Sequence, residues 1–132
     1  MHSSLQKLTL VKNKVNEIIT QKQLKTNPTI IVISKTFPQE KIKPLLDSGH
    51  THFGENKIQE AESKWSEIMN TNKNLQLHMV GRLQSNKAKK AVKLFNFIHS
   101  LDSEKLALKL SQSEKELNKK RQEFYLKHLG KS

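Results

Sequence analysis

Residues 30–35 read Ile-Ile-Val-Ile-Ser-Lys, the most apolar stretch of the chain, and it ends in a lysine. Four consecutive β-branched residues are typical of a strand that is buried on both faces, as in a parallel sheet. Asn27-Pro28 breaks the segment that precedes this stretch. We therefore predict a buried parallel strand over residues 30–34.

Helix-like and strand-like segments alternate along the rest of the chain. Apolar residues at helical spacing predict a leading amphipathic helix over residues 5–19. The same reading predicts helices over 38–48, 57–69, 86–95 and 103–118, and parallel strands near 52–54, 76–80 and 97–100. Such alternation indicates βα units. Four units are half of a (β/α)₈ barrel of about 250 residues, although the count alone also permits a small doubly wound sheet.

Local signals refine these boundaries. Gly49 predicts the end of the second helix, and Pro44 inside that helix predicts a division or a kink. Ser85 is placed to cap the helix over 86–95. From Lys119 the alternation stops, because the remaining residues lack the apolar strand that a fifth unit would need. We expect a single domain over 1–132 with an atypical tail at 119–132.

The amino-acid composition limits the classes of partner that we expect. The net charge of +12 comes from 22 lysines and only 2 arginines, whereas proteins that read nucleic acid rely on arginine. Aromatic residues for stacking on bases are few. A basic RNA-associated protein is thus an alternative, and no specific nucleic acid is expected. Without cysteine, an apolar membrane span or a secretory signal, we expect a cytoplasmic protein with no membrane partner.

Lys35 is the sharpest chemical feature. The C-terminal ends of strands form the active face of parallel α/β folds, and we expect a lysine there to be partly desolvated. Desolvation favours the neutral amine, which attacks aldehydes to form a Schiff base. The alternative is a lysine that extends from the strand end into water.

Two further stretches offer polar groups at strand ends. Asn56 follows the second strand and is placed either to hydrogen-bond a ligand or to cap the next helix. His78 lies on the third strand, and residues 84–87 enter a helix N-terminus, where anions are favoured, or form an ordinary capped loop. The four histidines between 50 and 99 suggest a metal site, but no ligand spacing recurs and we expect none.

Three motifs in this order resemble the pyridoxal phosphate homeostasis protein family (the YggS/PROSC type): Ile-Ser-Lys-Thr at 33–36, Phe-Gly-Glu-Asn at 53–56 and His-Met-Val-Gly-Arg-Leu-Gln-Ser-Asn-Lys at 78–87. The family is similar to the N-terminal domain of alanine racemase. The resemblance covers residues 5–118 or so and implies the N-terminal half of a (β/α)₈ TIM barrel of the fold-type III class.

The resemblance also implies pyridoxal 5′-phosphate (PLP) as the cofactor. By resemblance Lys35 is the Schiff-base lysine, and Asn56 and His78 lie on neighbouring strand ends that face the cofactor. Family members are regarded as PLP carriers in vitamin B6 homeostasis rather than as established catalysts, so no catalytic residue is expected. A racemase-like PLP enzyme that acts on amino acids is the alternative within the same chemistry.

The sequence departs from the family in two ways. Many members carry a second lysine two positions after the Schiff-base lysine, where this chain has Phe37. The second half of the barrel, which in the family holds the phosphate-binding residues, is missing. We therefore expect a truncated copy that binds PLP weakly.

Overall fold

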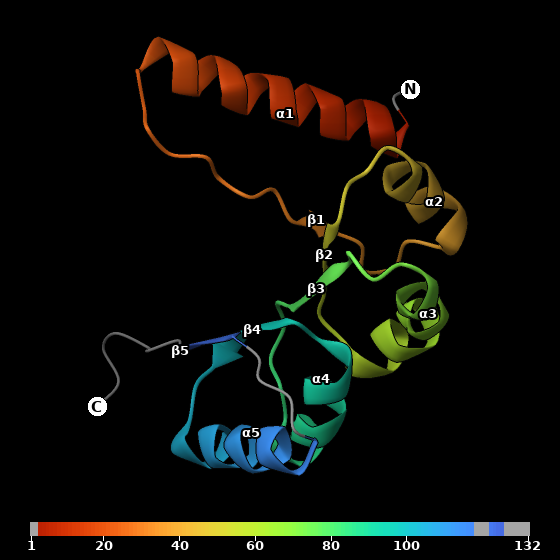
Figure 1. Ribbon diagram of the computed structural model, residues 1–132, viewed down its shortest axis with the longest axis vertical. Helices are drawn as coiled ribbons and strands as arrows, with labels where there is room; N and C mark the ends of the chain where they lie inside the picture. Colours follow the sequence, from red (N-terminus) through yellow and green to blue (C-terminus); the bar gives the residue numbers. More distant parts are fainter. Residues whose placement is uncertain (1–2, 118–121, 126–132) are drawn as a thin grey trace.

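A computed structural model describes residues 3–117 and 122–125, which contain five strands in one sheet (Figure 1). The strands follow chain order: β1 (Val32–Ile33), β2 (His52–Glu55), β3 (Gln76–Met79), β4 (Phe97–Leu101) and β5 (Gln122–Tyr125). Every neighbouring pair is parallel. The four predicted strands and their parallel arrangement are therefore confirmed. The prediction that the first strand is buried on both faces is wrong, because β1 is a short strand at the edge of the sheet and Ile33 is 42% exposed.

Helices connect the strands and cover one side of the sheet, as half of a β/α barrel requires (Figure 1). They are α2 (Gln39–Asp47), α3 (Ile58–Thr71), a 3₁₀ turn η1 (Ser85–Lys87), α4 (Ala88–Leu94) and α5 (Glu104–Leu117); a further helix, α1 (Ser4–Gln21), precedes β1. The helices predicted from apolar spacing are present. None of the helices in the described part of the chain is long and apolar enough to cross a membrane.

The hydrophobic core lies between the sheet and these helices. Phe53, Leu77 and Ile98 from three adjacent strands are fully buried there, and the Trp65 ring of α3 lies 4.9 Å from the ring of Phe53. Burying such side chains stabilises a fold by about 1.5–3 kcal/mol each. Because side chains alternate along a strand, the residue that follows each of these three, such as Gly54 after Phe53, faces the opposite side of the sheet.

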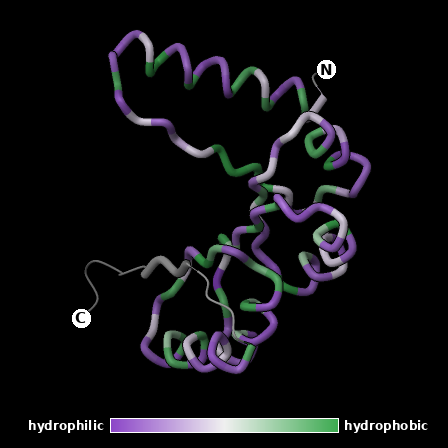
Figure 2. Tube along the Cα trace, in the orientation of Figure 1, coloured by the Kyte–Doolittle hydropathy of each residue, from purple (hydrophilic) through white to green (hydrophobic). Residues whose placement is uncertain are grey.

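The leading helix is only loosely attached to the rest. Ser3 and Gln6 form a capping box at its start, and Leu8 is its buried residue among those described. Leu10 and Val11 are 53% and 49% exposed. Figure 1 shows α1 beside α2, set apart from the sheet, and Figure 2 shows hydrophobic residues interrupting a largely hydrophilic helix.

Two local predictions are wrong. Pro44 does not divide α2, which runs from Gln39 to Asp47 and keeps Ile42 and Leu45 buried, whereas the alternative of a kink at the proline stays a prediction. Ser85 does not cap α4, because the chain first forms η1 and α4 begins only at Ala88 without a side-chain cap.

The expectation that no fifth strand follows α5 is also wrong. β5 pairs with β4 in parallel, with Phe97 opposite Gln122 and Ile98 opposite Glu123. Backbone hydrogen bonds form such an edge strand, so it does not require the apolar run that a central strand shows. The rest of the predicted tail at 119–132 lies outside the described residues.

Candidate functional site at the C-terminal edge of the sheet

Lys35 stands on a tight turn just beyond β1. The Ser34 N–H donates to the Gly54 carbonyl at 2.9 Å, and the Phe37 N–H closes the turn onto the Ser34 carbonyl at 3.0 Å. Thr36 adopts φ 64°, a left-handed conformation that costs a residue with a Cβ atom about 1–2 kcal/mol. Lys35 is exposed, so the expected desolvation is not observed: the chain leaves the sheet at Ser34.

A buried carboxylate, that of Glu55 at the end of β2, lies behind this turn. Its Oε2 atom accepts hydrogen bonds from Ser34 Oγ at 2.5 Å, the Lys64 ammonium at 3.1 Å and the Trp65 indole N–H at 3.0 Å. Glu55 is 0% and Lys64 9% exposed. Within the described residues Glu55 Oε1 has no hydrogen-bond partner. Buried charges of this kind persist only when they are paired and hydrogen-bonded.

Lys64 extends this network to the far side of Lys35. Its ammonium donates to the Ser34 carbonyl at 2.6 Å and to the Glu60 carboxylate at 3.3 Å. The same Glu60 oxygen accepts the backbone N–H of Thr36 at 2.6 Å. Side chains of α3 therefore hold the residues immediately before and after Lys35.

Glu60 is suited to this role as an anion. The Thr36 N–H lowers the pKa of the Glu60 carboxyl, desolvation opposes that effect, and the Lys64 ammonium adds to the lowering. The carboxylate is consequently ionised at neutral pH, where a charged acceptor makes a stronger hydrogen bond to a backbone N–H than a neutral one.

Asn56 follows β2 at the same edge of the sheet. It does not cap α3, whose N-cap is Lys57 without a side-chain cap, so the capping alternative is wrong. The backbone of Gly81, beyond β3, lies against it: a Cβ atom at position 81 would stand 2.5 Å from the Asn56 carbonyl oxygen. Asn56 is half-buried and held between two strand ends.

A hollow of about 450 Å³ opens between the segments that follow β2 and β3. Its lining includes Asn56, Glu60 and three cationic side chains, those of Lys57, Arg82 and Lys87. Because Glu60 also holds the amide next to Lys35, this hollow adjoins the Lys35 turn. An excess of cations at such a rim favours a ligand with an anionic group.

His78 lies deeper, on the sheet face that the helices do not cover. Its Nε2 atom is 2.9 Å from His52 Nδ1, and its Nδ1 atom is 2.8 Å from His99 Nε2. The ring stacks on Phe97 at 4.3 Å. Three histidines from β2, β3 and β4 thus form one hydrogen-bonded chain. Within the described residues no group of three or more His, Cys, Asp or Glu is arranged to hold a metal ion.

Burial keeps these imidazoles neutral. Desolvation lowers the pKa of His78 to about 4, and the neighbouring charges of His99 and His52 contribute. Desolvation also lowers the pKa values of His52 and His99. Both nitrogens of His78 are engaged by other histidines, and His78 is not among the residues that line the hollow next to the Lys35 turn.

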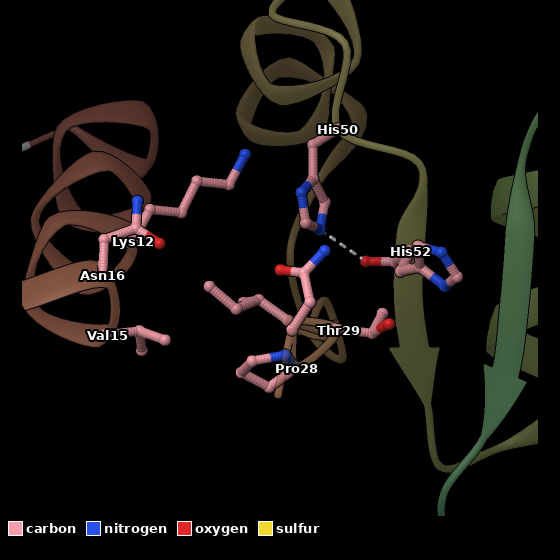
Figure 3. A pocket seen from close by; sticks show the side chains of 9 residues that line it. Lys12, Val15, Asn16, Pro28, Thr29, His50 and His52 are labelled. Atoms are coloured by element: carbon pink, nitrogen blue, oxygen red, sulfur yellow. Dashed lines mark hydrogen bonds between the residues drawn. The ribbon is translucent and has the colours of Figure 1, made fainter. Parts of the chain in front are cut away.

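A second hollow, of about 290 Å³, lies at the opposite edge of the sheet. Figure 3 shows the Lys12 side chain of α1 reaching toward His50, whose Nε2–H donates to the His52 carbonyl at 2.8 Å. Thr29 and Pro28, which precede β1, complete this wall. The hollow thus sits at the N-terminal ends of the strands, the side that in β/α folds serves stability rather than chemistry.

The sequence indicated Lys35, Asn56 and His78 as candidates, and their role stays a prediction, but the network of Glu55, Glu60 and Lys64 was not predicted. A signal was present in each case. Alternation along β2 turns Glu55 toward the helices, where a carboxylate needs partners. Lys64 falls within the apolar stripe of α3 that includes Ala61 and Trp65.

The fold defines half of a β/α barrel, with Lys35 on a turn at the C-terminal edge of its sheet. The chain is 39% identical over 90 residues to the pyridoxal phosphate homeostasis protein of Synechocystis, covering 68% of this chain and 41% of that protein. The protein of the same name from Pasteurella multocida is 32% identical over 108 residues, covering 81% and 46%. No family model matches.

A solved structure agrees with this similarity. PipY of Synechococcus elongatus, determined with PLP bound, superposes with a TM-score of 0.68 at 38% identity, covering 81% of this chain and 51% of PipY. The chain therefore belongs to the pyridoxal phosphate homeostasis protein family and corresponds to the N-terminal half of its barrel. It spans less than half the length of the curated relatives named above.

Proposed function

We propose that this chain binds PLP and takes part in intracellular PLP homeostasis as a carrier rather than as a catalyst. One observation carries the proposal: Lys35 follows β1 directly, at the sheet edge where Asn56 and a cation-lined hollow gather. Its similarity to PipY, solved with PLP bound, supports the same cofactor. A cytoplasmic location stays a prediction.

The residues at this edge fit the chemistry of the cofactor. PLP presents an aldehyde, which condenses with an amine, and a phosphate, which cations hold. Lys35 would hold the cofactor through its Nζ amine, and PLP would supply the aldehyde carbon to which that amine binds. When bound, PLP supplies an electron-accepting ring.

The chain's own residues then divide the remaining tasks. Lys35 is exposed and free to reach a ligand at the rim. Asn56 offers an amide for a ring substituent, and Lys57, Arg82 and Lys87 offer positive charge for the phosphate. His78 lies on the sheet face that the helices do not cover, outside the lining of this hollow, and its contact with the cofactor stays a prediction.

Borohydride reduction of the PLP-treated protein, followed by peptide mass mapping, tests the proposal. We expect the pyridoxyl group on Lys35 and an absorbance band at about 400–430 nm that is lost in Lys35→Ala. Lys43→Ala, which removes an exposed lysine of α2 outside the lining of this hollow, is the matched control and should keep both signals. Label spread evenly over surface lysines, unchanged in Lys35→Ala, would contradict the proposal. A basic RNA-associated protein would show no such band.

A further inference from the structure

We propose that the network of Glu55, Glu60 and Lys64 positions Lys35 for the cofactor. The inference rests on the proposed function, because it assigns the network a task toward the lysine that holds PLP. None of the three is a catalytic residue in this proposal. They act on the backbone that carries the reacting amine.

The first observation is that the network holds both neighbours of Lys35. On one side, the Ser34 hydroxyl donates to Glu55 at 2.5 Å and the Ser34 carbonyl accepts from Lys64 at 2.6 Å. On the other side, the Thr36 N–H donates to Glu60 at 2.6 Å. The Cα atom of Lys35 is thereby fixed, although its side chain remains exposed.

The second observation is the backbone conformation that Glu60 maintains. Thr36 has φ 64°, an unfavourable value for threonine that persists only where surrounding contacts enforce it. The contact present is a hydrogen bond to an ionised carboxylate, the strongest kind that a backbone N–H makes. Without it, the turn between Ser34 and Phe37 is free to relax, and the direction of Lys35 is lost.

The third observation is that burial of this ion pair is not explained by stability. Lys64 and Glu55 are 9% and 0% exposed in the apolar layer between sheet and helix. Replacing a buried ion pair by apolar residues is often neutral or stabilising, so such a pair is weak support for stability. The pair instead joins β2 and α3 to the residues on either side of Lys35. We therefore assign it the task of positioning Lys35.

The experiment compares Glu60→Gln with Glu67→Gln. Glu67 is an exposed glutamate on the same helix, so the control makes the same charge change away from the turn. Glu60 is the better target because its side chain is 30% exposed, whereas Glu55 is fully buried and its loss endangers the fold. Far-UV circular dichroism confirms that each variant folds, and Glu60→Asp, which keeps the charge but shortens the reach, provides a second variant.

The first readout needs no cofactor. Amide hydrogen exchange at Thr36 and Phe37 should be faster in Glu60→Gln by about tenfold, the factor that corresponds to one charge-assisted hydrogen bond of about 1.5 kcal/mol. Glu67→Gln should exchange like the wild type. Equal exchange in all three proteins would overturn the inference, whether or not the chain binds PLP.

The second readout uses PLP itself. After borohydride reduction, the ratio of label on Lys35 to label on other lysines should be lower by about fivefold or more in Glu60→Gln. In the double variant with Thr36→Gly the ratio should recover, because glycine adopts positive φ without a clamp. A ratio that stays at the wild-type level in Glu60→Gln and Glu60→Asp refutes positioning. If the wild-type protein shows no preference for Lys35, the proposed function is refuted. The exchange experiment still tests whether Glu60 holds the turn, because it needs no cofactor.

Discussion

Acidification should destabilise this fold through His78. In the folded protein, burial lowers the pKa of the His78 ring to about 4. In the unfolded chain the ring is exposed to water and keeps the ordinary histidine pKa of 6.5. Between these two pKa values His78 is protonated in the unfolded chain but remains neutral in the folded protein. The contribution to stability is therefore fully present above about pH 6.5 and is lost as the pH falls toward about 4.

The magnitude follows from the two pKa values. At about pH 5, linkage gives a loss of about 2 kcal/mol for His78 alone, relative to neutral pH. Water at the uncovered sheet face screens part of this effect, so we expect about 1–2 kcal/mol. The lowered pKa values of His52 and His99 act in the same direction. Glu60, with its pKa below the usual carboxyl value, affects stability only at lower pH.

Urea unfolding followed by circular dichroism, from about pH 7.5 to about pH 5, measures this loss as a fall in the free energy of unfolding. His78→Gln keeps polar atoms in the chain of rings but removes the titrating group, and its stability should depend less on pH. A wild-type free energy that is the same at both pH values would refute the reasoning. So would an equally large fall in His78→Gln.

Other predictions concern the turns and the cofactor. Gly81→Ala should lower stability by about 1–3 kcal/mol in urea unfolding, because the new Cβ atom would press on the Asn56 carbonyl. Gly49→Ala is its control, because Gly49 has φ 94° but open space around it. There only backbone strain of about 1–2 kcal/mol applies. A larger loss of stability in Gly49→Ala than in Gly81→Ala would contradict the steric account. In absorbance titrations we expect this chain to bind PLP orders of magnitude more weakly than PipY, since by family resemblance several phosphate hydrogen bonds of about 1.5–3 kcal/mol each belong to the other half of the barrel. Equal dissociation constants would show that residues 1–132 already hold the phosphate.

The order of helices and strands was predictable because periodicity is a local property. Residues 30–33 are all apolar, and the stripe of α3 recurs every three or four residues, so both are visible in short windows. β5 was missed because Gln122 and Glu123 begin it, and an edge strand depends on backbone pairing with β4 rather than on an apolar run.

The candidate site was predictable only in part. Lys35 and Asn56 could be predicted to lie near each other because the C-terminal ends of parallel strands meet at one edge, and their role toward a cofactor stays a prediction. The contacts that hold them join residues far apart in the chain: Ser34 and Glu55 are 21 positions apart, and Thr36 and Glu60 are 24 apart. No periodic pattern encodes such pairs. The exposure of Lys35 likewise depends on where the chain leaves the sheet, and hydropathy does not indicate that position.

Trp65 gives the molecule an optical signal of its own. It is the one tryptophan in the sequence, it is fully buried, and its indole N–H donates to Glu55. Its fluorescence therefore depends on the carboxylate that also binds Ser34, the neighbour of Lys35. Changes in the hydrogen bonds of Glu55 should therefore alter the emission of Trp65, and they can be followed without an added dye. A pyridoxyl group on Lys35 would lie close enough to quench the emission by energy transfer, so that loading of the cofactor becomes visible as a loss of light.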